Sequence, residues 1–256
     1  MNSITPIKAF EDNYIWKISN GSDCLVVDPG DAAAVFQDIE FHKQKISAIL
    51  VTHHHGDHIG GVKALKERFS CPVYGPSKEA NNVVDIPLFE GDKIRPEGCK
   101  MQFQVIEVPG HTSGHISFYS KEAAVLFCGD TLFAGGCGRL FEGTPTQMLT
   151  SLNKFKTLPP ETKIYCAHEY TLNNLKFAMS MEPLNEKLVS RFKQTNIMRE
   201  QDIPSVPSLL KLELDTNPFL RVDQKEIFES VSKIKSCDKG DLVGIFQQIR
   251  CLKDQF

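Results

Sequence analysis

Apolar runs along the chain repeatedly end in polar side chains, and this pattern predicts a set of buried strands. Four runs rich in β-branched and aromatic residues are typical of such strands: 46–52, 103–108, 124–129 and 163–167. The residues that follow them include His53, His111, Asp130 and His168. Because ligand sites in sheet proteins gather where several strand ends meet, we expect these side chains to share one site.

The first third of the chain predicts an α/β arrangement. Two short strands at 14–18 and 24–28 flank the turn signal 20–23, which indicates a hairpin. Asp31 is placed to cap a helix that runs to about Lys43, and the strand that ends before His53 follows. A strand, a helix and a further strand in succession are typical of the α/β class.

The spacing of apolar residues later becomes helical. Thr144 and Pro145 begin a predicted helix, and beyond residue 171 apolar residues recur every three or four positions. The segment 202–209 is expected to be a non-helical connector. We therefore predict a catalytic domain over residues 1–170 and a mainly helical domain over residues 171–256.

Composition narrows the classes of function. The 256 residues are 41% hydrophobic and 24% charged, with a net charge of −3, which is typical of a globular protein. This charge gives no general attraction to nucleic acid or to anionic membranes, so we expect neither as a partner. No apolar run approaches the roughly 18–20 residues of a spanning helix, and the first 13 residues lack the apolar core of a secretory signal.

The distribution of cysteines indicates a reducing compartment. Eight are scattered along the chain without a Cys-x-x-Cys pair: Cys24, Cys71, Cys99, Cys128, Cys137, Cys166, Cys237 and Cys251. Several lie in apolar runs, where cysteine usually serves as a small buried hydrophobe. We expect free thiols, a cytoplasmic location and no thiolate-bound metal.

The densest chemical signal is the run from His53 to His58. In extended backbone the side chains of His53 and His55 share one face and that of His54 points the other way. We expect Gly56 to turn the chain, so that Asp57 and His58 reach a second, nearby ion. Imidazole and carboxylate suit zinc, iron or manganese, and pairs of ions about 3.5–4 Å apart are recurrent in hydrolases.

Two nearby polar residues allow more than one interpretation. His115 begins an alternating strand-like run, which favours a hydrogen-bonded or core histidine over a metal ligand. Asp28 ends a strand before Pro29-Gly30, where it either touches the site or shapes the turn.

The segment 135–144 is too long and glycine-rich for a simple turn. It lacks the Gly-Lys-Ser/Thr ending of a phosphate-binding loop. Its glycines let backbone N–H groups approach an anionic or peptide-like ligand, to which Arg139 adds charge. A flexible surface loop is the alternative.

The pattern His-x-His-x-Asp-His after an apolar strand resembles the metallo-β-lactamase superfamily, and further segments narrow the resemblance to the glyoxalase II family of hydroxyacylglutathione hydrolases. These segments are 109–115, 129–133, 136–138, 167–171, 217–221 and 253–256. The resemblance implies an αββα sandwich of two mixed β-sheets with a mainly helical C-terminal domain. It also implies hydrolysis of the thioester S-D-lactoylglutathione to D-lactate and glutathione, the second step of methylglyoxal detoxification by the glyoxalase pathway.

The resemblance also implies the residues of the site. One metal ion is expected to bind His53, His55 and His111, the other Asp57, His58 and His168, and Asp130 is expected to bridge them. Glutathione contacts are expected from Arg139, Tyr170, Arg250 and Lys253. Phe141 stands where other members have a tyrosine, so we expect only backbone or ring contact from it. Arg139 replaces a lysine of some members, which keeps the charge but changes the hydrogen-bond geometry.

The expected mechanism is attack by hydroxide bound to two divalent ions, zinc in the first instance and iron or manganese as alternatives, because a metal lowers the pKa of water toward about 7. Asp57 and Asp130 are the expected catalytic carboxylates. The glutathione thiolate leaves readily, since a free thiol has a pKa of about 8.5.

Other functions share this ligand set. The alternatives are a persulfide dioxygenase, a lactonase, a phosphodiesterase and a metal-binding scaffold. A cationic C-terminal helix suits an anionic tripeptide better than a neutral lactone, which favours the thioesterase, and we expect a monomer.

Overall fold

The computed structural model describes residues 3–79, 82–234, 238 and 240–256, so Cys237 lies outside the described residues. The chain forms two compact units. The first comprises Met1–Val108 and Thr112–Gly129, and the second comprises Pro109–His111 and Asp130–Phe256.

A six-stranded sheet forms the base of the first unit. Its strands, in spatial order, are β1 (Ser3–Ala9), β2 (Asn13–Asn20), β3 (Asp23–Val27), β4 (Lys45–Leu50), β5 (Val73–Pro76) and β6 (Ile86–Leu88). The first three strands are antiparallel, and β3 to β6 are parallel. The predicted hairpin is confirmed, since Asn20 pairs with Asp23 across a two-residue turn.

Helices α1 (Ala32–His42) and α3 (Val62–Phe69) pack against this sheet. As predicted, the Asp31 carboxylate caps α1 by accepting hydrogen bonds from the backbone N–H groups of Ala33 and Ala34, at 2.8 and 3.4 Å. Val35 of α1 and Leu65 of α3 lie with strand residues in one buried apolar cluster. The burial of this cluster fixes the direction in which β4 ends.

The remaining strands of the first unit are β7 (Lys93–Ile94), β8 (Phe103–Glu107), β9 (Ile116–Ser120) and β10 (Val125–Gly129), which pair antiparallel in this order. Phe103 is fully buried and meets the rings of Phe118 and Phe127 edge to face, with centroids 6.4 and 6.1 Å apart. Aromatic pairs favour this geometry. The predicted strands at 103–108 and 124–129 are therefore confirmed to within one residue.

The second unit is mainly helical. It contains the hairpin of β11 (Leu132–Phe133) and β12 (Gly136–Cys137) and the antiparallel pair of β13 (Lys163–Cys166) and β14 (Ser208–Leu209). Its helices are α4 (Pro145–Lys156), α5 (Thr171–Met181), α6 (Glu186–Glu200), α7 (Leu210–Thr216), α8 (Lys225–Ser232) and α9 (Leu242–Asp254), with a 3₁₀ turn, η2, at Pro218–Leu220. The connector 202–209 is non-helical as predicted, but the short strand β14 was not expected.

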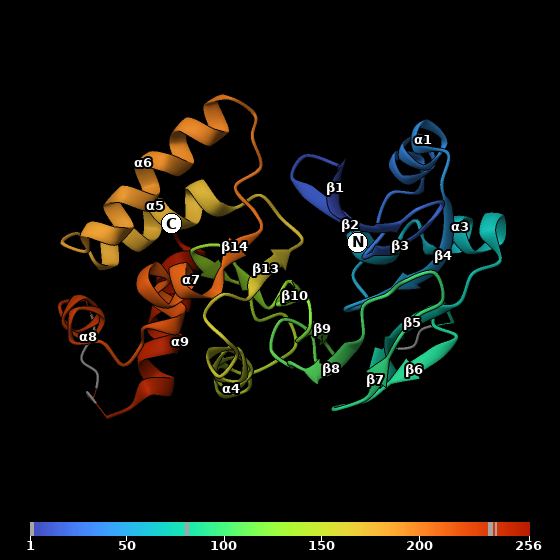
Figure 1. Cartoon of the computed structure of the whole chain (residues 1–256). Helices are drawn as coiled ribbons and strands as arrows, with labels where there is room; N and C mark the ends of the chain where they lie inside the picture. Colours follow the sequence, from blue (N-terminus) through green and yellow to red (C-terminus); the bar gives the residue numbers. More distant parts are fainter. Residues whose placement is uncertain (1–2, 80–81, 235–237, 239) are drawn as a thin grey trace. The chain divides into compact units, whose positions relative to one another are not determined.

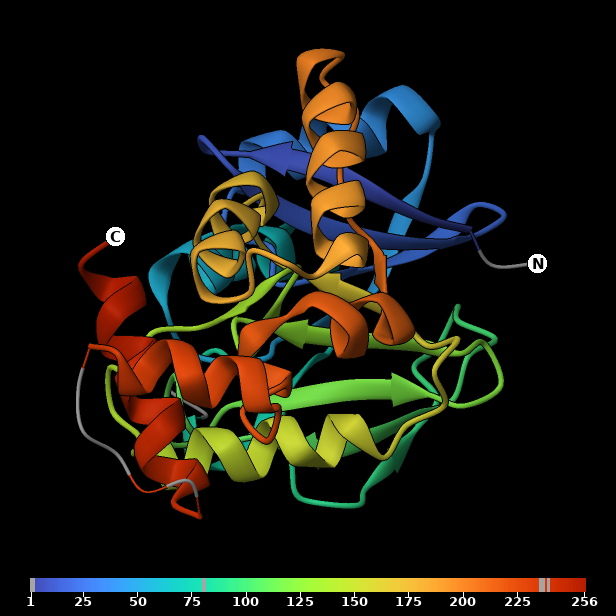
Figure 2. The same cartoon turned by 90° about the vertical axis from the view of Figure 1, so that its left-hand side faces the viewer.

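Helices of the second unit pack in pairs. α5 lies beside α6, and α9 contacts α4 and α8 (Figures 1 and 2). The helical spacing predicted beyond residue 171 is confirmed in α9, where it forms an apolar stripe: Ile245, Phe246 and Ile249 are buried, whereas Leu242 is 38% exposed. Asp241 caps this helix through the N–H of Gly244, at 2.8 Å.

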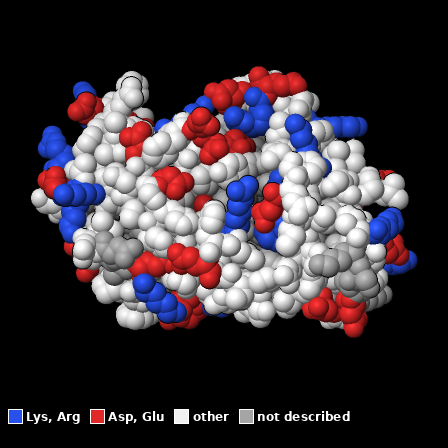
Figure 3. Space-filling view, turned by 180° about the vertical axis from the view of Figure 1, so that it is seen from behind, with Lys and Arg blue, Asp and Glu red and all other residues white. Residues whose placement is uncertain are grey.

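Charge is mixed on the surface. On the face shown in Figure 3, Lys and Arg side chains alternate with Asp and Glu, and among the described residues neither sign forms a continuous field. None of the helices in the described part of the chain is long and apolar enough to cross a membrane.

The Thr144 cap of α4 offers a test of the local sequence signals. Its hydroxyl accepts the Gln147 N–H and the Gln147 side chain accepts the Thr144 N–H, which completes a capping box. We expect Thr144→Ala to lower the free energy of unfolding by about 1 kcal/mol. Urea unfolding measures this loss.

Thr150→Ala is the matched control, since Thr150 lies exposed in the same helix and bonds only back to the Thr146 carbonyl. Alanine is the better helix former, so this change should be neutral or slightly stabilising. Equal losses in both variants would contradict the role of the cap.

Candidate metal centre

His53 and His55 follow the end of β4 and lie together in the first unit. The Nε2 atom of His53 is 3.1 Å from the Nδ1 atom of His55, and their rings meet edge to face. His54 faces elsewhere, with its Nδ1 atom 2.9 Å from Glu79. The predicted alternation of the three histidines is confirmed, because the chain stays extended beyond the strand.

Asp57 and His58 lie on a short helix, α2 (Gly56–Ile59), which the sequence analysis did not predict. The backbone changes from extended at His55 to helical at Gly56, so the chain turns there as expected, but a Cβ at Gly56 would meet no atom within 4 Å and the turn does not require glycine. The close approach occurs at Gly30 instead, where a Cβ would lie 1.8 Å from the carbonyl oxygen of Asp57. Only glycine lets the turn after β3 pack so tightly under α2.

Asp28 orients this part of the site. Its carboxylate accepts hydrogen bonds from the backbone N–H and the hydroxyl of Thr52, both at 2.7 Å, and lies 3.1 Å from Nδ1 of His58. Carboxylates that hold the second nitrogen of a histidine fix its ring orientation. The sequence analysis left Asp28 open between site and turn. The parallel pairing of β3 with β4 decides for contact with the site.

Two further residues of the first unit border these side chains. The ring of His115 is fully buried and stacks on that of His53, with centroids 4.6 Å apart. The side-chain amide of Asn13 donates a hydrogen bond to Asp57 at 3.0 Å. Asp57 also lies 3.6 Å from Nε2 of His58. The first unit thus gathers four of the predicted ligands by itself.

The second unit gathers the other three around Asp130. Nε2 of His111 and Nε2 of His168 each lie 3.4 Å from the same oxygen, Oδ2, of Asp130. Nδ1 of His111 donates a hydrogen bond to the Arg139 carbonyl at 2.9 Å, which directs Nε2 toward Asp130. At Gly138 a Cβ would lie 2.0 Å from the Asp130 carbonyl oxygen, so the glycine-rich segment packs closely on the backbone of Asp130.

Aromatic rings surround His168 and His111. The ring of Tyr170 stacks on that of His168, with centroids 4.7 Å apart, and Phe133 meets both rings edge to face. Phe141 meets the ring of His111 in the same way, at 5.2 Å, and is 62% exposed. The sequence analysis did not identify Phe133, which carries no polar group to signal a role.

The predicted cationic residues occupy different environments. Arg139 is exposed and lies 3.6 Å from Asp254, whereas Arg250 is 6% exposed. Arg250 was expected to contact glutathione, and its guanidinium donates to the Cys137 carbonyl at 2.8 Å and to Asp254 at 2.9 Å. It also lies 5.1 Å from the centroid of the Phe219 ring, a cation–π distance.

Lys253 has a lowered pKa. Burial, together with the nearby charges of Arg250 and Arg139, lowers the pKa of Lys253 to about 8. Its ammonium lies 5.5 and 5.2 Å from the ring centroids of Phe177 and Phe256. The cation is therefore held in place but is half ionised at mildly alkaline pH.

Cys137 is no nucleophile despite its place in the glycine-rich segment. Burial raises the pKa of the Cys137 thiol to about 11, so the thiolate is scarce at neutral pH. Its carbonyl and sulfur both face Arg250.

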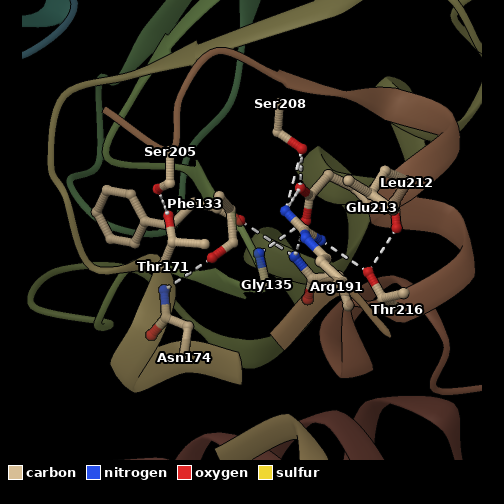
Figure 4. A network of polar contacts seen from close by, with 12 residues as sticks. Phe133, Gly135, Thr171, Asn174, Arg191, Ser205, Ser208, Leu212, Glu213 and Thr216 are labelled. Atoms are coloured by element: carbon tan, nitrogen blue, oxygen red, sulfur yellow. Dashed lines mark hydrogen bonds and ion pairs between the residues drawn. The ribbon is translucent and has the colours of Figure 1, made fainter. Parts of the chain in front are cut away.

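A network of buried polar residues bonds to the backbone of the β11–β12 hairpin (Figure 4). Glu213, which is fully buried, pairs with Arg191 and accepts the Gly135 N–H at 2.8 Å. Asn217 donates to Glu213 and to the carbonyls of Phe133 and Gly136, at 3.1, 3.2 and 2.9 Å. The network therefore fixes both the donors and the acceptors of the β11–β12 hairpin.

The donor set in each unit fits divalent metal ions. Nitrogens of His53 and His55 lie 3.1 Å apart, and nitrogens of His111 and His168 each lie 3.4 Å from one Asp130 oxygen. Ligand atoms around a metal ion are grouped in this way. The Nδ1 atom of His58 lies beside Asp28, and that of His111 bonds the Arg139 carbonyl, which is typical of ligand histidines.

Comparisons with known proteins agree along the whole chain. The family model described as the metallo-β-lactamase superfamily matches residues 11–98 and 100–168, and the one described as the hydroxyacylglutathione hydrolase C-terminus matches residues 169–256. A protein of Pseudomonas aeruginosa (strain LESB58), named hydroxyacylglutathione hydrolase, is 46% identical over 260 residues that cover 100% of both chains.

Solved structures show the same fold. The B3 metallo-β-lactamase BLEG-1 has a TM-score of 0.64 at 26% identity and covers 86% of this chain and 99% of its own. A protein crystallised in a di-iron-bound form has a TM-score of 0.59 at 28% identity, with 85% and 100% covered. The predicted α/β fold class, an αββα sandwich of two mixed sheets with a mainly helical C-terminal domain, is confirmed.

The Arg191–Glu213 pair generates a stability prediction. Glu213→Gln leaves a buried guanidinium without its charge partner and should cost about 3–5 kcal/mol of unfolding free energy. Arg191→Met combined with Glu213→Gln should recover most of this loss, because no unpaired charge remains and the glutamine oxygen still accepts the Gly135 N–H. Urea unfolding at equal metal content measures both, and equal losses in the single and double variants would rule out the ion pair as the cause.

Proposed function

Because the chain belongs to the hydroxyacylglutathione hydrolase family of the metallo-β-lactamase superfamily, we propose that it hydrolyses the thioester S-D-lactoylglutathione to D-lactate and glutathione. This reaction is the second step of methylglyoxal detoxification by the glyoxalase pathway. The observation that carries the proposal is similarity over the full chain, C-terminal domain included, since the ligand pattern alone serves several reactions.

We propose that two divalent ions, zinc in the first instance, bind these side chains. One would be held by His53, His55 and His111, the other by Asp57, His58 and His168, with Asp130 shared between them. The support is the chemistry of the donors and the groups that hold their second nitrogens. When bound, such ions lower the pKa of water toward about 7 and polarise a carbonyl oxygen.

The chain's own groups orient the reactants. Asp57, which accepts a hydrogen bond from Asn13, and Asp130, which faces His111 and His168, are the proposed catalytic carboxylates. Both act by accepting hydrogen bonds and holding charge, because the glutathione thiolate leaves without a strong acid.

We propose residues 171–256 as the substrate-binding domain, together with the segment that carries Arg139 and Phe141. Lys253 and Arg139 supply positive charge for the carboxylates of glutathione, and Tyr170 supplies a ring and a hydroxyl beside His168. Phe141 contributes its ring or backbone. Arg250 acts indirectly, by holding the Cys137 carbonyl and Asp254 in place.

A cytoplasmic monomer is the proposed working form. Cys24 and Cys137 are free thiols, and burial raises the pKa of Cys24 to about 12, which fits small buried hydrophobes in a reducing compartment.

The decisive assay uses the purified, zinc-loaded protein without oxygen. Hydrolysis of S-D-lactoylglutathione, followed at the thioester absorbance, should proceed at the aerobic rate, because attack by hydroxide requires neither oxygen nor electrons. A strict requirement for iron and dioxygen would instead indicate a persulfide dioxygenase.

Ligand variants make this assay specific for the site. His55→Ala and Asp130→Ala should each lose bound metal and at least about 99% of the rate, since they remove ligands that no neighbour replaces. His54→Ala is the matched control and should retain both ions, because its side chain faces Glu79. Loss of an ion in this control would overturn the assignment of the three histidines.

The lowered pKa of Lys253 predicts a pH dependence. The ammonium is present below about pH 8 and lost above it, so KM for the thioester should rise about two- to fivefold between pH 7 and 9, with a smaller change in kcat. Lys253→Arg should remove the dependence, and Lys253→Met should show the raised KM at every pH.

A stability measurement separates this effect from unfolding. The folded state holds the Lys253 proton less tightly than the unfolded chain, so this group's contribution to stability rises as pH increases from about 8 toward 10.5. A KM that stays constant in the wild type over this range would contradict contact between Lys253 and substrate.

A further inference from the structure

Glu79 is a buried carboxylate to which the proposed chemistry assigns no role. It is the last residue of a 3₁₀ turn, η1 (Ser77–Glu79), that follows β5, and its side chain is 4% exposed. A carboxylate in such a place is costly unless several donors satisfy it.

Three nitrogen atoms of the first unit lie beside this carboxylate. The Gly114 N–H donates to Oε1 at 2.6 Å, and the His54 N–H donates to Oε2 at 3.0 Å. Nδ1 of His54 also lies 2.9 Å from Oε2. Both hydrogen bonds come from backbone N–H groups, so Glu79 fixes the course of the chain more than the position of one side chain.

The backbone that Glu79 holds carries proposed ligands on either side of His54. β4 ends at Leu50. In the segment beyond it, two carboxylates accept hydrogen bonds from backbone N–H groups. Asp28, after β3, accepts the Thr52 N–H, and Glu79, after β5, accepts the His54 N–H. Since β3 and β5 flank β4 in the sheet, the ligand segment is held from both sides.

The contact with Gly114 shows that this arrangement is sterically specified. A Cβ at Gly114 would lie 2.7 Å from Cγ and 2.9 Å from Oε1 of Glu79, closer than packed atoms approach. Glycine at this position is therefore what allows the carboxylate to reach both backbone segments.

We propose that Glu79 is a positioning residue of the metal centre, which directs His53 and His55 by holding the His54 backbone. The inference rests on the proposed metal site, and it assigns no ligand role to Glu79. Ordered ligands bind a metal more tightly because less conformational entropy is lost on binding. Groups that orient metal ligands typically change affinity or activity about 10–100-fold when they are removed.

Glu79→Gln is the sharpest variant, because it keeps the shape and removes one acceptor. The two backbone N–H groups use different oxygens, whereas glutamine has one oxygen and an NH₂ group that faces a donor. We expect release of zinc to a chromogenic chelator to become about tenfold faster or more, with kcat reduced by a similar factor and KM within about twofold. The absorption spectrum of the cobalt-substituted protein should also shift.

Gly114→Ala tests the same contact from its other end. Its Cβ would displace the Glu79 carboxylate while leaving the charge in place, so the same fast release and spectral shift are expected. This variant keeps the inference testable if Glu79→Gln does not fold, which a thermal unfolding curve reports.

His54→Ala separates the backbone contact from the side-chain contact. It retains the His54 N–H and should release zinc at the wild-type rate, as should the surface control Glu122→Gln, whose side chain is 65% exposed. Release as fast in His54→Ala as in Glu79→Gln would overturn the backbone argument. Wild-type release, spectrum and kcat in both Glu79→Gln and Gly114→Ala would overturn the proposal.

Failure of the thioesterase assignment would be distinguishable from failure of this inference. A wild-type protein that binds zinc but does not hydrolyse S-D-lactoylglutathione would refute the proposed substrate. The chelator and cobalt measurements would still report whether Glu79 positions the ligands, because neither depends on turnover.

Discussion

The structure depends on one constraint, which is that imidazoles and carboxylates packed against one another must each be oriented by a second group. His53 and His55 approach to 3.1 Å, and two histidines approach the same oxygen of Asp130 to 3.4 Å. Without such a group, these rings would be free to rotate away from one another. The hydrogen bond from His111 to the Arg139 carbonyl and the contact of Asp28 with His58 hold them in converging orientations.

The two units meet this constraint by different means. In the first, carboxylates placed after β3 and β5 hold the backbone just beyond the end of β4. In the second, the Arg191–Glu213 pair holds the hairpin of β11 and β12, whose Phe133 ring packs on His168 and Tyr170. Both solutions place buried charge behind a ligand segment, where low dielectric strengthens each hydrogen bond.

The three cationic residues proposed for substrate recognition in the second unit differ in exposure. Arg250 is buried and supports the Cys137 carbonyl, whereas Lys253 and Arg139 remain within reach of solvent. The charges of these cations act on one another, and together with burial they lower the pKa of Lys253.

The amino-acid sequence by itself determined the features that depend on neighbouring residues. The alternation of His53, His54 and His55, the Asp31 and Thr144 caps and the apolar stripe of α9 all follow from periods of two or 3.6 residues and from local hydrogen bonds. The run from His53 to His58 is equally local, whereas the assignment of His111, Asp130 and His168 as candidate ligands came from the resemblance to the family.

Only the tertiary structure decided which groups hold those ligands. Glu79 lies 25 residues from His54, Glu213 lies 78 from Gly135, and Arg250 lies 113 from Cys137. The position of Arg250 in the sequence says nothing of the Cys137 carbonyl that its guanidinium meets. Local patterns determine which face of an element is apolar, but contacts between distant segments arise only when the elements pack, and such contacts adjoin the proposed metal ligands.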